Sequence, residues 1–174
     1  MGRCAAVLAV FRELAFAEPD VIKLAEEMDA RISADMGMED FVTAIIAEFA
    51  PGEVRIVNCG HHPPVKAAAG CTGLQLVASG QPVPPLGLHP RPAAQDITLR
   101  PGDRLLFYTD GLVEARDRAG RFFDLRHQKV TRALAEPDLD AAVGRVVALL
   151  AEHGGDRPAD DLLLVLAERI AAPL

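Results

Sequence analysis

The spacing of hydrophobic residues predicts two helices at the start of the chain. Apolar side chains recur there at three- and four-residue intervals, which places them on one face of a helix. The first stripe consists of Val7, Phe11, Leu14 and Ala15, and the second of Val21, Leu24, Ala25, Met28 and Ile32. We expect the two helices to form a hairpin around Glu18 and Pro19.

Three later segments are apolar at both odd and even positions, a pattern typical of strands that are buried on two faces. These segments are residues 41–49, 105–109 and 162–167. We expect all three to be central strands and mostly buried.

Two Pro-Gly pairs mark turns beside these strands. Pro51-Gly52 leads from the first segment into the alternating stretch 53–59, which predicts a hairpin. Pro101-Gly102 joins a strand that ends near Leu99 to the segment 105–109. A final helix is indicated by one apolar stripe, made of Leu139, Val143, Val146, Val147 and Leu150.

The order of these elements bears on the fold class. Strands come in antiparallel pairs, with helices before and after them rather than between each pair. This order favours an α+β fold, an α/β/β/α sandwich of two antiparallel sheets flanked by helices, over a doubly wound parallel sheet. The chain has 174 residues, half of them hydrophobic, which suits one core better than two. We therefore expect one domain over residues 1–174.

Charge and cysteine content narrow the classes of function. The net charge is −7, and the eighteen Lys and Arg are spread along the chain without a basic run, so nucleic acid is not an expected partner. The three cysteines lack the spacing of a zinc site, which indicates reduced thiols and a cytoplasmic location. The apolar octet at residues 4–11 ends at Arg12. It is too short for an export signal or for a membrane span of about 20 residues.

Acidic residues stand where two of the predicted strands end or begin. Asp110 follows the segment 105–109 and precedes Gly111, which permits close approach of backbone and ligand. Asp160 and Asp161 precede the segment 162–167. If the two strands are antiparallel neighbours, these acids converge at one sheet edge, where carboxylates suit a hard divalent cation. Taken singly, each motif also fits a turn or a solvated loop.

An ordered set of motifs extends this interpretation. Along the chain stand FRELA (11–15), FVTAIIAEF (41–49), NCGHHPP (58–64), PPLGL (84–88), LRPGDRLLFYTDGLVEARD (99–117), GRFF (120–123) and ADDLLLVLAER (159–169). In order and approximate spacing, nearly the whole chain resembles the SpoIIE-type serine phosphatases of the metal-dependent PPM (type 2C) family. The combination of PGD, YTDG and a terminal DD before a strand is what makes the resemblance specific.

The resemblance implies a pair of Mn²⁺ or Mg²⁺ ions whose bridging water hydrolyses phosphoserine. Asp110 and Asp160 match metal ligands of the family. The supporting residues that the resemblance implies are Asp161, Gly111, Glu114, Asn58 and His61. Glu114 also fits a surface glutamate, and the histidines before two prolines, His61 and His62, also fit a turn.

Some features depart from the family pattern. The family's GGDFYD-like and GDVSGKG-like elements each supply an Asp to the metal pair, and neither is present in this sequence. We therefore expect the N-terminal strands and part of the metal site to be missing, and unpaired sheet edges to favour association, for example into a homodimer. Leu163 stands where the family usually has Thr, and Asp124 where glycine is common.

Two classes of function stay open. As an enzyme, the domain would hydrolyse phosphoserine on a regulatory protein, which in this family is typically an anti-sigma-factor antagonist with a STAS fold. As a non-enzymatic module, it would keep the fold and a partner surface without a working metal pair. The first two helices, within residues 3–36, match a switch element of the family.

Overall fold

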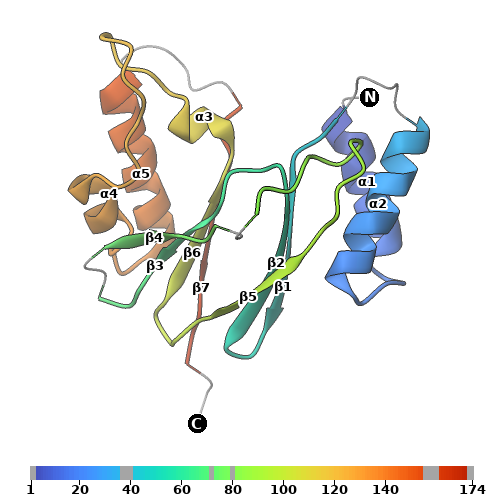
Figure 1. Ribbon diagram of the computed structural model, residues 1–174. Helices are drawn as coiled ribbons and strands as arrows, with labels where there is room; N and C mark the ends of the chain where they lie inside the picture. The colour runs from blue at the N-terminus through green and yellow to red at the C-terminus, as the bar shows by residue number, and fades with distance from the viewer. Residues whose placement is uncertain (1–2, 36–40, 71–72, 79–80, 155–160, 172–174) are drawn as a thin grey trace. The chain divides into compact units, whose positions relative to one another are not determined.

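The computed structural model describes residues 3–35, 41–70, 73–78, 81–154 and 161–171. The chain divides into two compact units (Figure 1). The first unit is Met1–His61 with Ser79–Thr98, and the second is His62–Ala78 with Leu99–Leu174. The prediction of one domain stays a prediction, and each unit is described by itself.

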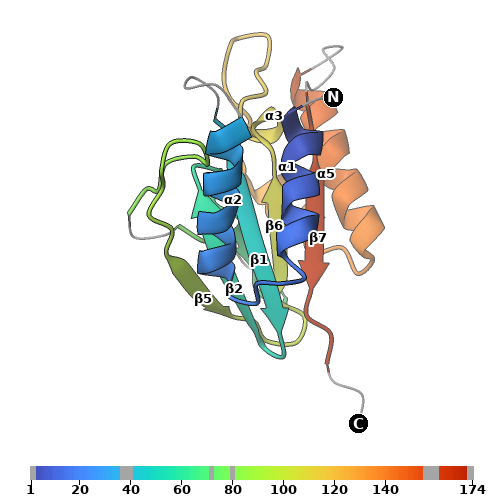
Figure 2. The ribbon, with the colours of Figure 1, turned by 90° about the vertical axis from the view of Figure 1, so that its right-hand side faces the viewer.

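In the first unit, the part of the chain that the structure describes forms two helices and a three-stranded antiparallel sheet. Its elements are α1 (Arg3–Leu14), α2 (Val21–Asp35), β1 (Ala44–Ala50), β2 (Glu53–Cys59) and β5 (Ala94–Thr98). The strand order is β1-β2-β5. Figure 2 shows α1 and α2 side by side along the sheet. The predicted helix pair and the β1-β2 hairpin, in which Ala50 pairs with Glu53 across the Pro51-Gly52 turn, are both confirmed.

The stripe of α2 forms most of the core of this unit. All five of its predicted apolar residues are buried, and they pack with Ile46, Val57 and Cys59 of the sheet. Asp29 is the buried polar residue of this helix, and its carboxylate accepts a hydrogen bond of 2.7 Å from the backbone N–H of Gly87. This bond ties α2 to the PPLGL segment, where Leu86 is fully buried.

The prediction that residues 41–49 form a central, mostly buried strand is wrong. Within the described residues β1 lies at the edge of its sheet, because it pairs with β2 alone. Ile46 is the buried residue of β1, and the ring of Phe49 is 55% exposed. An apolar pattern on both faces does not reveal how many neighbouring strands a segment has.

The described residues of the second unit form a four-stranded antiparallel sheet and three helices. Its elements are β3 (Val65–Ala67), β4 (Leu74–Leu76), β6 (Arg104–Tyr108), α3 (Asp110–Val113), α4 (Gln128–Ala133), α5 (Leu139–Gly154) and β7 (Leu164–Glu168). The strand order is β4-β3-β6-β7. Two antiparallel sheets with flanking helices confirm the predicted fold class.

Of the two apolar strands predicted here, one is central and the other is not. β6 lies between β3 and β7, and Leu105, Leu106 and Tyr108 are buried, as predicted. The prediction for residues 162–167 is wrong, because β7 is an edge strand within the described residues and Val165 is half exposed.

The core of this unit packs α5 against one face of the sheet. The buried residues of α5 are Ala142, Val146, Leu149 and Leu150. Val146 and Leu150 agree with the predicted stripe, whereas Val147 is 41% exposed and was wrongly placed in it. The buried face of the helix therefore overlaps the predicted face but is rotated from it, by less than the roughly 100° that separates successive residues of a helix.

Arg104 fastens the connection between α4 and α5 to the sheet. Its side chain is almost fully buried, and its Nε donates to the Glu168 carboxylate at 2.6 Å. Its terminal nitrogens donate to three backbone carbonyls, those of Leu134 at 2.8 Å, Glu136 at 2.6 Å and Pro137 at 3.1 Å. The planar guanidinium thus satisfies acceptors from β7 and from the α4–α5 connection at once.

Candidate functional site

The candidate site lies at the end of the β6–β7 strand pair. The two strands are antiparallel, with Tyr108 opposite Leu164, so the C-terminal end of β6 lies beside the start of β7. This confirms the strand arrangement on which the predicted convergence of acids depends. Asp110 follows β6 directly, and Asp161 stands three residues before β7.

Thr109 holds the two strand ends together. Its hydroxyl donates to the carbonyl of Asp161 at 2.6 Å and accepts from the backbone N–H of Leu163 at 2.9 Å. Its own backbone N–H donates to the Leu163 carbonyl at 3.1 Å. A threonine at this position before a helix commonly caps it, but the Thr109 hydroxyl makes no capping bond to α3 and serves the strand pair instead.

Asp110 opens the short helix α3 and is exposed. Gly111 follows it within the helix, and Glu114 ends the helix by donating its backbone N–H to the Asp110 carbonyl at 2.8 Å. The Glu114 side chain is exposed. These contacts fix the backbone of the TDG turn, while the roles of Gly111 and Glu114 toward a metal stay predictions.

Asp161 has an unusual backbone conformation. Its φ is +49°, in the left-handed region that aspartate enters more readily than most residues. The hydrogen bond from Thr109 holds it there, and its side chain is exposed. Asp160, the predicted metal ligand of the pair, lies outside the described residues.

Asn58 and His61 belong to the first unit and form a tight loop there. The Asn58 amide donates to the His61 carbonyl at 2.9 Å and its oxygen accepts from the His61 N–H at 2.8 Å. Between them Gly60 has φ +70°, and a Cβ there would lie 2.6 Å from the Pro85 ring. NCGHHPP is therefore a turn element, and a role of Asn58 or His61 near the metal stays a prediction.

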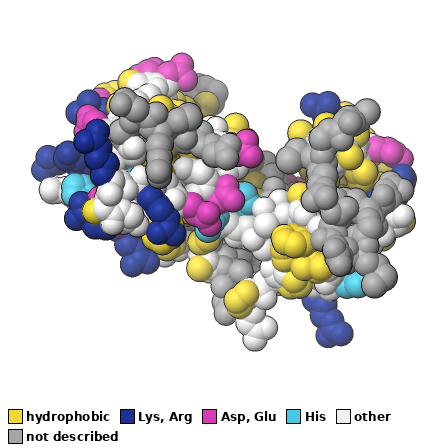
Figure 3. Space-filling model, turned by 90° about the horizontal axis from the view of Figure 1, so that it is seen from above, with side chains coloured by type: hydrophobic (Ala, Val, Ile, Leu, Met, Phe, Trp, Pro, Cys, Tyr) yellow, Lys and Arg dark blue, Asp and Glu magenta, His cyan; other side chains and the backbone are white. Residues whose placement is uncertain are grey.

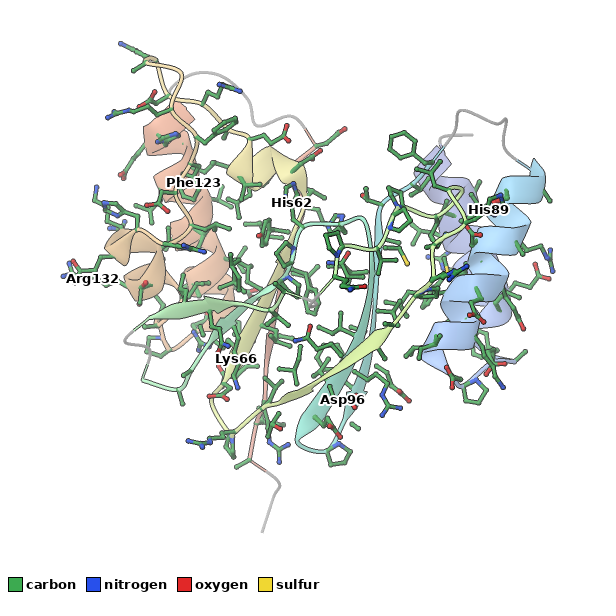
Figure 4. All side chains as sticks on the ribbon, in the orientation of Figure 1. His62, Lys66, His89, Asp96, Phe123 and Arg132 are labelled. Carbon is green, nitrogen blue, oxygen red and sulfur yellow. The ribbon has the colours of Figure 1, made fainter. Side chains whose placement is uncertain are left out.

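Two residues beside Asp110 were not singled out by the sequence. Thr109 is one, and the other is Tyr108, whose buried ring stacks on His62 with centroids 6.1 Å apart. Burial raises the pKa of Tyr108, so the phenol stays neutral at physiological pH. Figure 4 shows His62 beside the end of β6 that leads into α3. One sequence feature could have pointed to these two residues. Tyr108 and Thr109 carry hydroxyl groups at the end of a strand whose preceding residues, 105–107, are apolar.

Asp103 of the PGD motif has a structural role. Its carboxylate accepts from the N–H groups of Arg100 and Ala69, each at 2.9 Å, and pairs with the Lys66 ammonium at 3.0 Å. The Arg100 bond closes the turn before β6, and the other two contacts attach this turn to β3 and the residue stretch after it, so the acid of PGD stabilises the sheet rather than contributing to the candidate site.

The donor set of the described residues fits a hard cation only in part. Asp110 and Asp161 offer carboxylates at one exposed edge, and carboxylate oxygens are what Mn²⁺ and Mg²⁺ prefer. However, no group of three or more His, Cys, Asp or Glu side chains converges within the described residues. Burial, and to a smaller extent the negative charge of Asp29, raises the pKa of Cys59 to about 11. This thiol is therefore protonated at neutral pH and is a poor metal ligand.

Solved structures similar to this chain include PP2C-type phosphatase domains. The RsbU and RsbW domains of Rv1364c from Mycobacterium tuberculosis align with a TM-score of 0.78 at 24% identity, over 97% of this chain and 47% of that one. The PP2C domain of SpoIIE from Bacillus subtilis, with a fragment of its regulatory domain, aligns with a TM-score of 0.75 at 12% identity, over 95% and 49%. The catalytic domain of the phosphatase PstP in complex with 2 manganese ions gives 0.69 at 20%, over 98% and 85%.

The family follows from the sequence match. Residues 2–170 match the family described as Stage II sporulation protein E (SpoIIE), and the chain therefore belongs to this family. It spans about half the length of the first two solved structures above. No curated protein matched the chain. Within the described residues, no helix is long and apolar enough to cross a membrane.

Proposed function

We propose that this chain is the phosphatase domain of a metal-dependent protein serine phosphatase. Its substrate would be phosphoserine on a regulatory protein, such as an anti-sigma-factor antagonist of the STAS type. The observation that carries the proposal is the β6–β7 pair, which brings the ends of two acidic motifs to one sheet edge through Thr109. The match to the SpoIIE family over residues 2–170 supports it. A cytoplasmic location and a homodimer are further predictions.

The proposed metal ligands are Asp110 and Asp160, with Asp161 in support. When bound, Mn²⁺ or Mg²⁺ supplies an activated water and neutralises phosphoryl oxygens. The manganese ions in PstP support this choice of cation. Thr109 contributes by fixing the spacing of the two acidic turns, since its hydroxyl bonds both sides of the Asp161–Leu163 segment. The Thr109 bonds thus hold the backbone of these turns in place before any ion binds.

A second candidate function is a phosphatase-like binding module that lacks turnover. It is favoured by one observation, that the described residues bring together no group of three metal-binding side chains. Two cations close together repel each other, and few carboxylates would offset that repulsion poorly. The module would keep the fold and a surface for the regulatory protein.

The experiment that separates the two candidates supplies the N-terminal elements. The N-terminal strands of a SpoIIE-family relative, with their GGD-like and GDVSGKG-like acids, are fused before Met1. We expect this chimera to hydrolyse para-nitrophenyl phosphate and a phosphoserine protein with Mn²⁺. Asp110→Asn should lower the rate by about a hundredfold or more, the scale of losing one group that stabilises transition-state charge.

A matched control is Asp140→Asn, the same chemical change at an exposed position in the first turn of α5. Its rate should stay within about twofold of the parent chimera, as for surface substitutions far from a site. An inactive chimera that still folds and binds Mn²⁺ would favour the binding module. Equal losses in Asp110→Asn and Asp140→Asn would remove Asp110 from the site.

A further inference from the structure

The chain has no continuous basic run, but a third of its Lys and Arg lie in one segment of the second unit. Residues 116–132 hold six Lys and Arg and two Asp, a net charge of +4 in a chain whose total is −7. The six basic residues, here called the basic face, are Arg116, Arg118, Arg121, Arg126, Lys129 and Arg132, and all six are exposed. In Figure 3, dark blue Lys and Arg side chains gather over the side of this unit that holds α4 and α5.

The first half of this segment is a hydrogen-bonded hairpin. Asp117 accepts from the N–H groups of Ala119 and Arg121 at 2.8 and 2.9 Å, and its second oxygen accepts from Arg121 Nε at 2.7 Å. The Arg116 guanidinium lies 3.9 Å from the centre of the Phe122 ring, and Arg116 and Phe122 pair as an isolated bridge. The hairpin therefore presents its charges and its exposed aromatic ring in a fixed arrangement.

Most of this positive charge is not neutralised within the protein. Asp117 is occupied by Arg121, while the side chains of Arg118, Arg126 and Arg132 make no hydrogen bond or ion pair with any described residue. A cavity of about 550 Å³ in this part of the unit is lined by three acids and four basic or imidazole side chains, namely Asp117, Asp124, Glu152, Arg121, Lys129, His127 and His153. The acids offset the positive charge of this lining, so the positive charge without an acidic partner lies outside the cavity, on Arg118, Arg126 and Arg132.

The hairpin starts directly from the candidate site. Phe123 donates its N–H to the carbonyl of Ala115 at 2.9 Å, so the base of the hairpin follows α3, which begins at Asp110. Arg116 is six residues after Asp110. Figure 1 shows the hairpin rising from α3 at the same edge of the sheet. The Arg116 end of the basic face is therefore the end that adjoins, along the chain, the edge at which phosphoserine is proposed to react.

We propose that the basic face docks an acidic segment of the protein on which the domain acts. The inference rests on the proposed function, because it assigns a partner surface to the same site. An exposed ring beneath an arginine is typical of protein interfaces, in which aromatic residues and Arg are enriched. A nucleic acid is long enough to extend beyond the basic face, where the acidic remainder of the protein, with its net charge of −7, would repel the phosphates. A short acidic segment would contact only the basic face.

The test is binding of the 174-residue chain to a fluorescein-labelled acidic peptide with a central phosphoserine, measured by anisotropy. We expect Arg118→Glu, Arg126→Glu and Arg132→Glu together to weaken binding at low salt by about tenfold, since each exposed pair contributes little alone. Salt should reduce this difference. The matched control reverses three exposed charges of the first unit, Arg12→Glu, Lys23→Glu and Arg91→Glu, and should change binding by less than about twofold.

A second variant, with Arg118→Gln, Arg126→Gln and Arg132→Gln, removes the positive charges without adding negative ones and should weaken binding by a smaller factor. It keeps the test valid if the Glu variant fails to fold. Equal weakening in the basic-face and control triples would overturn the proposal, because net charge alone would explain it. Tighter binding of a labelled oligothymidylate than of the peptide, lost in the same triple, would instead assign the face to nucleic acid. Peptide binding needs no turnover, so failure of the phosphatase proposal would leave these binding differences unchanged.

Discussion

Asp103 shows how one buried acid makes stability depend on pH. Burial alone raises the pKa of its carboxyl, but hydrogen bonds from Arg100 and Ala69 and the Lys66 ammonium outweigh burial and hold the pKa below its usual range. A lowered pKa contributes stability that is fully present above the unfolded-state value of about 3.9 and is lost as pH falls through the folded-state value. Asp103→Asn should therefore cost about 1–3 kcal/mol at neutral pH.

The measurement is urea unfolding of both proteins by circular dichroism from pH 7 down to pH 3. The difference between the wild type and Asp103→Asn should stay constant down to about pH 4 and then shrink, because the wild-type carboxyl becomes protonated. The same difference at pH 7 and at pH 3 would show that the Asp103 charge does not stabilise the turn.

Single residues were predicted well where the chemistry is local to the motif. Asp110 and Asp161 were placed at a strand end and a strand start from their neighbours alone, and the structure puts both there. Thr109 and Asp103 were missed, because their partners lie 52 and 34 residues away in the chain, at Asp161 and Ala69. A single sequence reveals which groups could bond but not which distant groups they meet.

At the scale of elements, the central and edge strands of the second sheet should differ in their sensitivity to substitution. Leu106 of β6 is 1% exposed, whereas Leu164 of β7 is only partly buried against the same core. We expect Leu106→Ala to lower the free energy of unfolding by about 2–5 kcal/mol and Leu164→Ala by about half as much. An edge-strand side chain removes less apolar area from water on folding. Urea unfolding of the wild type and the two variants gives both changes in the free energy of unfolding. A Leu164→Ala cost equal to that of Leu106→Ala would show that β7 is buried in solution.

Elements were predictable where local periodicity decides them. The α2 stripe and the β1-β2 hairpin follow from spacing and from a two-residue turn, and both are present. The central position assigned to residues 41–49 and 162–167 was wrong, because periodicity tells which faces are apolar and not how many strands lie alongside. The predicted buried face of α5 also differed from the observed one. The small residue Ala142 is buried, whereas the larger Val147 was expected to be.

At the scale of the whole chain, the order of elements predicted two antiparallel sheets but not which strands share one. Pro101-Gly102 joins β5 to β6 in sequence, yet β5 pairs with β2, while β6 pairs with β3 and β7. A turn signal therefore marks a connection, and pairing is decided by distant strands that bury complementary faces. The sheet that carries the candidate site is assembled from strands spread over residues 65–168.

The last prediction is that these 174 residues alone are a poor phosphatase. The carboxylates of the proposed ligands, Asp110 and Asp160, can hold one hard cation loosely, but a second cation about 4 Å away needs further anionic ligands to offset the repulsion. We expect a Mn²⁺ dissociation constant of roughly a millimolar by calorimetry, and little turnover of para-nitrophenyl phosphate. The chimera with the family's N-terminal acids should bind more tightly and recover turnover. Robust Mn²⁺-dependent turnover by the 174 residues, abolished by Asp110→Asn or Asp160→Asn, would show that this chain already provides a complete metal site.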